Sequence, residues 1–261
     1  MTPRVLMVVP TLGRRPEHLR LCLASIAAQE VETDLVVVAP VTPELEHLVS
    51  SSGGRLVADP GRGMSGALNA GFEAALPGTP YVGWLGDDDL LSDGSLAATT
   101  AALDADPGAS MVYGWCDYVD DAGQVIFLNR AGALAGRILP FAPNLVPQPG
   151  SLMRLPYVQE LGGVDEELTL SMDLDLFLRL RRRGRLVALP QTLACFRWHV
   201  DSTTVGSERA SAEEADHVRM RYMSAPAAAL YRLGRWPGRW ALRLVKWRVR
   251  RQARRVGVST S

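Results

Sequence analysis

The chain has 261 residues, of which 47% are hydrophobic and 21% charged, a composition that excludes a globally disordered protein. The formal net charge is zero, but twelve of the 28 basic residues lie between positions 219 and 255, and all 28 acidic residues precede this segment. An acidic body and a basic tail indicate two parts with different roles.

Cysteine usage and hydropathy narrow the class of protein further. Cys22, Cys116 and Cys195 are far apart and form no C-x-x-C pair, which excludes a disulfide framework and a cysteine-rich zinc site. The apolar run at 5–9 is too short for the core of a signal peptide, and no segment approaches the ~18 apolar residues of a membrane span. We therefore expect a cytoplasmic protein, or one that lies peripherally on the inner face of the membrane.

In the first third of the chain, short apolar runs alternate with segments of helical periodicity. The expected strands are residues 5–9, 35–39, 55–58 and 81–85, and the expected helices are 17–29, 43–50 and 65–75. This alternation predicts a largely parallel sheet with helices on both faces. Ligands bind at the carboxyl ends of such strands, so Thr11, Asp59 and the Asp87–Asp89 run should meet at one edge.

The pattern is mixed from residue 92 onward. The expected helices are 92–105 and 170–183, and the expected strands are 110–118, 124–128 and 186–189. Residues 132–150 are rich in proline and glycine and are expected to be irregular, whereas the basic tail 219–255 is expected to be helical. We predict one α/β domain over residues 1–205 and a helical basic extension over 206–261.

Three consecutive carboxylates, Asp87, Asp88 and Asp89, directly follow the expected strand at 81–85. An isolated pair of surface aspartates is usually a solvated turn. A strand of a parallel sheet is buried on both faces, however, and three charges at its end repel one another unless a cation offsets them. Mg²⁺ takes one or two carboxylates and completes its shell with substrate phosphates, so the run indicates a divalent metal site.

Further motifs follow in order along the chain. They are Pro10-Thr11, Gly66-Ala-Leu-Asn-Ala-Gly71, Trp84-Leu-Gly-Asp-Asp-Asp-Leu90, Gly162-Gly-Val-Asp165, Met172-Asp-Leu-Asp-Leu176 with Arg179, and Phe196-Arg-Trp-His199 with Ser202. Together they resemble the inverting family 2 glycosyltransferases with the GT-A fold, from residue 5 to about residue 204. The resemblance implies a Rossmann-like, mostly parallel sheet flanked by helices, and a hexosyltransferase that uses a nucleoside-diphosphate sugar.

The resemblance also implies roles for the acidic residues. Asp87 and Asp89 match the D-x-D pair that holds Mn²⁺ or Mg²⁺, and Asp88 between them is a candidate for donor binding. Which of the three ligates the metal stays open. Asp173 matches the general base that takes a proton from the acceptor hydroxyl. Asp175 is two residues further on and points elsewhere on a helix, so a structural role is expected for it. Without the resemblance, Asp173 is more simply a helix N-terminal acid that the dipole favours.

The donor-binding residues follow from the same comparison. Arg197 and His199 alternate along an expected strand and face the same side, where they are predicted to contact phosphate or metal. Pro10, Thr11, Asp59 and Asn69 are candidates for contact with the nucleotide. Relatives carry an acid at the end of the second strand, but residues 38–41 are Val-Ala-Pro-Val, so the choice between UDP, GDP and dTDP stays open.

Two other enzyme classes share parts of this pattern. Gly61, Gly63 and Gly66 fit the G-x-G-x-x-G motif of an NAD(P)-dependent oxidoreductase, with Asp87 about twenty residues on. Pro60 and the earlier strand–helix–strand unit weigh against that interpretation. A sugar nucleotidyltransferase would share the metal, but it needs a lysine near the first strand, and the only lysine is Lys246.

The basic tail suggests a partner for the protein. Trp236, Trp240, Leu244 and Trp247 fall on one helical face among arginines, so the 235–255 segment is typical of a helix that lies on a membrane surface. Packing of this face on the acidic body is an equal alternative. A membrane-bound tail would favour a lipid-linked acceptor, and a cell-surface polysaccharide is the other candidate acceptor. No nucleic-acid partner is expected.

Overall fold

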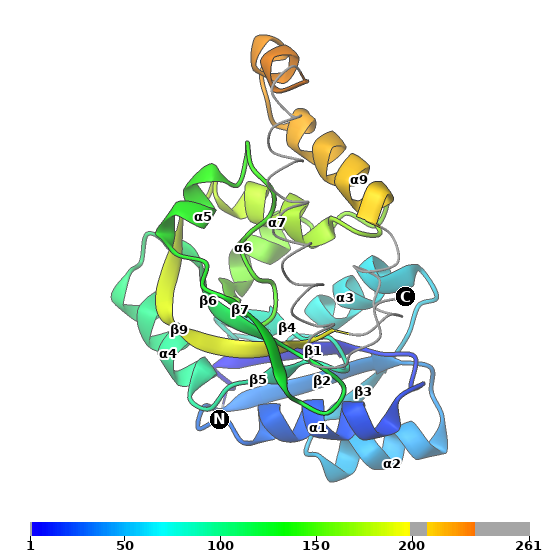
Figure 1. Cartoon of the computed structure of the whole chain (residues 1–261). Coiled ribbons are helices and arrows are strands. Elements are labelled where there is room, and N and C mark those ends of the chain that lie inside the picture. The colour runs from blue at the N-terminus through cyan, green and yellow to red at the C-terminus, as the bar shows by residue number, and fades with distance from the viewer. Residues whose placement is uncertain (1, 199–207, 233–261) are drawn as a thin grey trace.

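The computed structural model describes residues 2–198 and 208–232, and within them nine strands form one sheet (Figure 1). Its first half is parallel, in the order β3 (Arg55–Ala58), β2 (Thr33–Ala39), β1 (Val5–Pro10) and β4 (Tyr81–Trp84). Its second half continues with β8 (Leu152–Arg154), β6 (Ala109–Val119), β9 (Arg185–Arg197) and β5 (Leu90–Leu91), while β7 (Val125–Asn129) pairs with β6.

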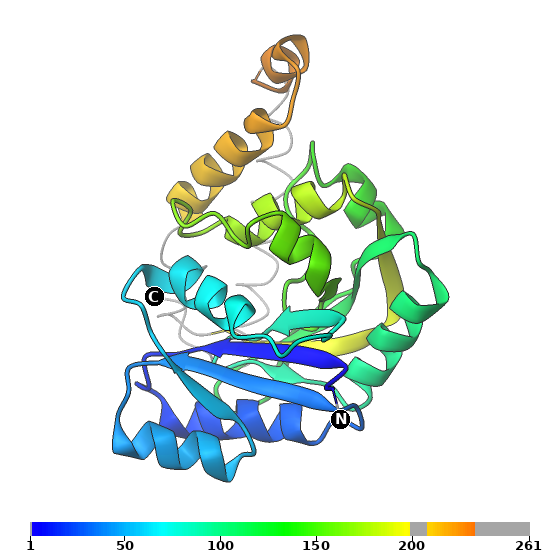
Figure 2. The same ribbon diagram turned by 180° about the vertical axis from the view of Figure 1, so that it is seen from behind.

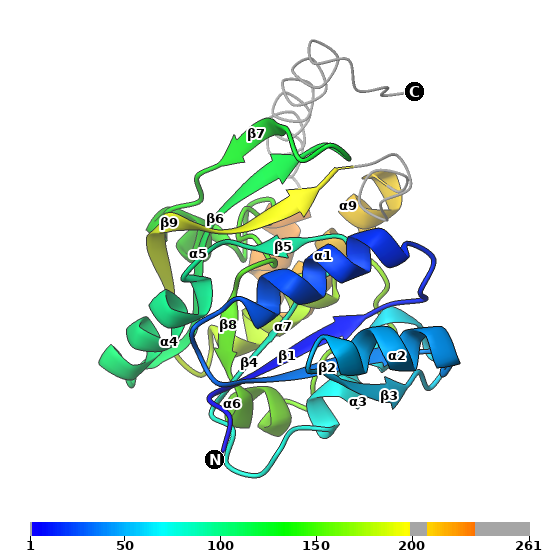
Figure 3. The same cartoon turned by 90° about the horizontal axis from the view of Figure 1, so that it is seen from below.

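The second half of the sheet is mixed, whereas the sequence predicted a largely parallel sheet. Figure 3 shows β7, β6, β9 and β5 in succession beside α1. Strands β6 and β7 are antiparallel because a short turn joins them, and only β6 and β9 are parallel in this half. The α/β class with a parallel nucleus at β3–β2–β1–β4 is confirmed, and the remaining strands curl away from it.

Helices cover both faces of the sheet, as Figures 1 and 2 show. One face packs against α1 (Pro16–Ala27), α2 (Pro43–Ser51) and α4 (Ser95–Ala105). The other face packs against α3 (Gly63–Glu73), α6 (Leu155–Glu160) and α7 (Met172–Leu180), with α5 (Ala133–Ile138) and α9 (Glu208–Arg221) beyond them.

Alternating side chains of the central strands build two separate cores. Val8 of β1 and Val36 of β2 pack into the core beneath α3, whereas their neighbours Val9 and Val37 pack into the core beneath α1. All four are fully buried. Successive side chains of a strand point to opposite faces, so a strand covered on both faces needs a continuous apolar run. That requirement explains why these strands could be recognised in the sequence.

Several predicted boundaries are wrong in the second half of the chain. The strand expected at 186–189 is the 13-residue β9, which extends to Arg197, and the segment 132–150 contains the short helix α5. Helix α9 begins at Glu208, before the basic tail. Its Val218 is fully buried in the α3 core, so α9 packs on the body. The predicted boundary at 205–206 and the 235–255 segment lie outside the described residues.

Gly71 brings α3 unusually close to the sheet. A Cβ atom placed on Gly71 would lie 2.3 Å from Cγ1 of Val8 on β1. We expect Gly71→Ala to lower the free energy of unfolding by about 1–3 kcal/mol because the added methyl overpacks this contact. Alanine's better helix propensity works in the opposite direction by about 1 kcal/mol. Denaturant unfolding of the wild type and the Gly71→Ala variant measures the difference in their free energies of unfolding.

Gly132→Ala is the matched control, because a Cβ at Gly132 meets nothing within 4 Å and its φ is −104°. This variant should unfold like the wild type. A Gly71→Ala variant as stable as the Gly132→Ala variant would show that α3 can shift away from Val8 at no cost.

Candidate active site

A cavity of about 1100 Å³ opens at the carboxyl ends of β1, β3 and β4. Thr11, Asp59 and the three aspartates after β4 all line it, which confirms that the sheet brings these strand ends to one edge. The cavity continues past this edge to the first turn of α7, where Asp173 lines its wall. Two groups of carboxylates that lie over eighty residues apart in the sequence therefore share one space.

The first two aspartates are held by the segment that follows β1. Asp87 accepts a hydrogen bond from the hydroxyl of Thr11 at 2.5 Å, and Asp88 forms an ion pair with Arg15 at 2.9 Å. Burial raises the pKa of Asp87, and the charge of Asp88 raises it further, whereas the Thr11 hydrogen bond and the Arg15 charge lower it. The turn after β1 thus fixes the direction of both carboxylates.

Asp89 is the most buried of the three, with 4% of its surface exposed. One of its oxygens accepts the backbone N–H of Arg197 on β9 at 3.0 Å. Burial raises its pKa well above the usual range, and the charges of Asp88 and Asp87 act in the same direction. A carboxylate held in this way is stabilised by a nearby cation.

Arg197 supports the segment Asp87–Asp89, here called the aspartate turn. Its guanidinium is buried and donates hydrogen bonds to three main-chain carbonyls, those of Asp88, Asp120 and Asp121, at 2.9 to 3.1 Å. The structure thus places it behind the aspartates, although it also lines the cavity. Contact of Arg197 with donor phosphate stays a prediction, and His199 lies outside the described residues.

The aspartate turn suits a metal ion that takes few protein ligands. Among the residues that the structure describes, no three His, Cys, Asp or Glu side chains form a cluster that could hold a metal. Mg²⁺ and similar ions are commonly held by one or two carboxylates plus substrate phosphates, so this finding does not conflict with Asp87 and Asp89 as ligands. The buried charge on Asp89, which Asp87 and Asp88 destabilise, fits a site completed by a cation.

Asp173 lies in the first turn of α7 and lines the same cavity. Its carboxylate accepts a hydrogen bond from the side-chain amide of Asn144 at 3.0 Å. Burial raises its pKa to about 6, against the opposing effects of the backbone N–H groups of the helix start and the charge of Arg219. A carboxylate with a pKa near neutrality is well suited to accept a proton from an alcohol.

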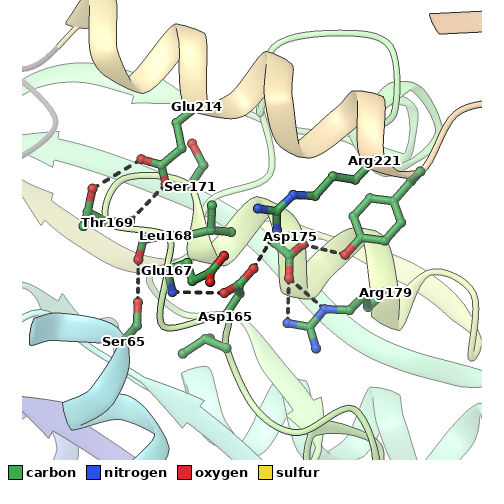
Figure 4. Close-up of polar contacts among 12 residues, drawn as sticks. Ser65, Asp165, Glu167, Leu168, Thr169, Ser171, Asp175, Arg179, Glu214 and Arg221 are labelled. Atoms are coloured by element: carbon green, nitrogen blue, oxygen red, sulfur yellow. Dashed lines mark hydrogen bonds and ion pairs between the residues drawn. The ribbon is translucent and has the colours of Figure 1, made fainter. Parts of the chain in front are cut away.

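Asp175, two residues further along α7, does not line the cavity, and Figure 4 shows it beside Arg179. It forms an ion pair with Arg179 at 2.7 Å and accepts a hydrogen bond from the hydroxyl of Tyr222 on the segment after α9. Its side chain is 2% exposed. The expected structural role of Asp175 agrees with these contacts.

The comparison with protein families decides the identity of the fold. Residues 7–148, more than half of the chain, match the model of glycosyl transferase family 2. The chain belongs to this family. The match includes the aspartate turn and ends before α7 and α9.

Solved structures share the family 2 fold at low identity. The S. aureus protein TarS, residues 1–349, in complex with UDP-GlcNAc is 16% identical with a TM-score of 0.63, covering 85% of this chain and 65% of that one. The mannosyltransferase PcManGT from Pyrobaculum calidifontis, in complex with GDP-Man and Mn²⁺, is 17% identical with a TM-score of 0.60, covering 97% and 86%. The chain thus spans just under two thirds of the TarS 1–349 structures. No curated protein matches the chain.

Membership of family 2 decides between a glycosyltransferase and the NAD(P)-dependent oxidoreductase that the glycine motif suggested. Gly61 and Gly63 have φ of +71° and +73°, so they make the turn between β3 and α3 possible. In a dinucleotide site this turn follows the first strand, in the middle of the sheet. In this family 2 chain it follows β3, the edge strand, and Thr11 follows β1. The motif serves the fold of α3, and the oxidoreductase interpretation is set aside.

Two candidate nucleotide contacts differ in their placement. Asp59 lines the cavity, and its backbone N–H donates to Ala39 at the end of β2, beside the place where the sequence lacks an acid. Asn69 does not line the cavity. Its amide exchanges hydrogen bonds with the backbone of Val164 at 2.9 and 3.0 Å and also donates to Glu166. Asn69 therefore ties α3 to the loop before α7, which gives no support to a nucleotide contact.

Sequence reasoning missed two residues that line the cavity and one that holds the turn before Asp173. Arg15 was not among the predicted site residues, and Asn144 lies in a segment expected to be irregular. Glu214, which acts on the turn before Asp173, carries no local signal at all. Only Arg15 was within reach of a sequence argument, because a cation directly after β1 can meet acids after β4.

Proposed function

We propose that the protein transfers a sugar from a nucleoside-diphosphate donor to an acceptor hydroxyl, with inversion and with a divalent metal ion. The single observation that carries this proposal is the continuous cavity between Asp87–Asp89 and Asp173. A donor diphosphate at the aspartate turn and an acceptor beside α7 would meet within it. The similar solved structures carry UDP-GlcNAc or GDP-Man, which supports a nucleotide sugar as donor without naming the base.

The reaction assigns one task to each end of the cavity. Asp173 takes the proton of the acceptor hydroxyl while that oxygen forms a bond to the anomeric carbon, and the bond from this carbon to the diphosphate oxygen breaks. The proton ends on Asp173 and the electron pair on the departing nucleoside diphosphate. Asp87 and Asp89, with His199 as the predicted third ligand, would hold Mn²⁺ or Mg²⁺, which stabilises the charge of the leaving group as a Lewis acid.

The acceptor end of the cavity has apolar walls. Phe141, Leu145 and Leu230 line it with 64%, 39% and 71% of their surfaces exposed. Exposed apolar side chains around a cavity favour a ligand with an apolar portion, which supports a lipid-linked acceptor over a purely polar polysaccharide. None of the helices formed by the described residues combines the length and hydropathy of a membrane span. Contact of the 235–255 segment with a membrane stays a prediction.

Thermal unfolding with a panel of nucleotides tests the proposal. UDP, GDP, dTDP and NADPH are each added with Mn²⁺ or with a chelator. We expect one nucleoside diphosphate to raise the melting temperature only with the metal, because a ligand that binds the folded state stabilises it by about 2.7 kcal/mol at 100 times its Kd. A metal-independent rise with NADPH alone would overturn the glycosyltransferase assignment.

A further inference from the structure

A carboxylate from α9 caps the turn that leads into α7. Glu214 accepts hydrogen bonds from the backbone N–H groups of Thr169, Leu170 and Ser171 at 3.0, 3.1 and 3.2 Å, and from the hydroxyl of Thr169 at 3.3 Å (Figure 4). Ser171 is the N-cap residue of α7 and makes no capping bond with its own side chain. Asp173 follows it by two residues. Glu214 thus binds, from another helix, the backbone N–H groups of the N-cap residue of α7 and of the two residues before it.

Further contacts hold this turn and helix α9 in place. Ser65 of α3 donates a hydrogen bond from its hydroxyl to the carbonyl of Leu168 at 2.7 Å. Helix α9 itself is fastened by the ion pair of Arg221 with Asp165 at 2.6 Å and by the hydrogen bond from Tyr222 to Asp175. Figure 4 shows these contacts around the start of α7. A displacement of α9 would therefore also displace Asp173.

We propose that Glu214 is a positioning residue for sugar transfer, because it fixes the turn on which α7 presents Asp173 to the cavity. The proposal rests on the proposed function for the role of Asp173 as the base. Negative charge near a helix start is favourable, and hydrogen bonds to an ionised acceptor are stronger than those between neutral groups. Three such bonds from consecutive residues restrict this turn more than a single side-chain cap could.

The charges around Asp173 give the proposal a second, independent consequence. Arg219 and Glu214 of α9 both act on the Asp173 carboxyl: Arg219 lowers its pKa and Glu214 raises it. Asp216 of the same helix is paired with Arg219 at 3.7 Å, and Asn144 donates from the facing loop. Removal of the charge on Glu214 should therefore lower the pKa of Asp173 below its value of about 6.

Three variants separate positioning from general stability. Glu214→Gln keeps an acceptor oxygen and loses the charge, Glu214→Ala loses both, and Glu213→Gln changes the neighbouring exposed acid, which pairs only with Arg209 in the described contacts. The pKa of Asp173 is followed by NMR of protein labelled with ¹³C at the aspartate carboxyls. The rate of donor hydrolysis is followed with the nucleotide sugar whose diphosphate stabilises the protein.

We expect Glu214→Gln to lower the pKa of Asp173 and to keep most of the hydrolysis rate. Glu214→Ala should lower kcat by roughly 10- to 100-fold with little change in the KM for the donor, because small misplacements of a reacting group have effects of this size. Glu213→Gln should match the wild type in both. The hydrolysis rate is therefore expected to be higher in Glu214→Gln than in Glu214→Ala, a result that a loss of global stability alone would not produce.

Two outcomes overturn the proposal. One is an Asp173 pKa in Glu214→Gln equal to that in the wild type and Glu213→Gln; the other is a Glu214→Ala variant with unchanged kcat. The NMR measurement needs no turnover. A lowered pKa in a protein that turns over no nucleotide sugar would therefore support the contact between Glu214 and the Asp173 turn while overturning the proposed function.

Discussion

Asp173→Asn is expected to lower the rate of sugar transfer by about 10²- to 10⁴-fold, the range over which a positioned general base contributes. Asparagine keeps the shape of the side chain and an oxygen that can accept from the Asn144 amide. It cannot take a proton from the acceptor hydroxyl. Binding of the donor nucleotide should not change, because Asp173 lies on α7 and the proposed diphosphate site is at Asp87–Asp89.

The pH dependence of the wild type provides a second measurement on the same residue. Burial raises the pKa of Asp173 to about 6, so the base is ionised above that pH and protonated below it. We expect kcat/KM to fall tenfold per unit as pH decreases through about 6. Asp173→Asn should lose this acid limb while keeping its residual rate.

Stability distinguishes a lost base from a damaged fold. A carboxyl whose pKa is higher in the folded than in the unfolded state destabilises the folded protein at pH values above the unfolded pKa, because it is ionised where its environment disfavours the charge. Asp173→Asn should therefore melt at or above the temperature of the wild type at pH 7. A variant that retains full activity, or an acid limb that survives the substitution, would assign the base to another group.

Asp89→Asn is expected to abolish the metal-dependent stabilisation by nucleoside diphosphate and to lower transfer at least about 100-fold, since a metal ion contributes several kcal/mol to a developing diphosphate charge. Asparagine preserves the acceptor for the backbone N–H of Arg197, so the turn should keep its shape. Burial raises the pKa of Asp89, and the neutral side chain removes that unfavourable charge. The apoprotein should be at least as stable as the wild type.

Asp93→Asn is the matched control, because Asp93 is an exposed acid four residues beyond Asp89. Isothermal titration of Mn²⁺ with the nucleoside diphosphate compares the two variants. Only Asp89→Asn should lose the metal-dependent binding. Equal losses in both would point to a general effect of charge near the turn, and no loss in either would remove Asp89 from the metal site.

Features of this protein that depend on residues close together in the sequence could be predicted from the sequence. The strands of the parallel nucleus are apolar runs because both of their faces are covered, and β1 and β2 were found for that reason. The rule that parallel strands end at one edge then placed Thr11, Asp59 and the three aspartates together. Asp173 needed the resemblance to a family, because a helix N-terminal acid is common for structural reasons.

Contacts between distant segments were decided only by the tertiary structure. Strand β9 shows no regular alternation of buried and exposed positions, and its length follows from pairing with both β6 and β5. Asn69 is engaged by Val164, which lies 95 residues away in the chain. Glu214 meets the turn before Asp173 across more than forty residues. Periodicity and motif spacing reflect interactions between residues that are close in the sequence, so they were sufficient to predict the parallel strands and the aspartate turn. Residues that come into contact only when α9 packs on α7 leave no such pattern in the sequence.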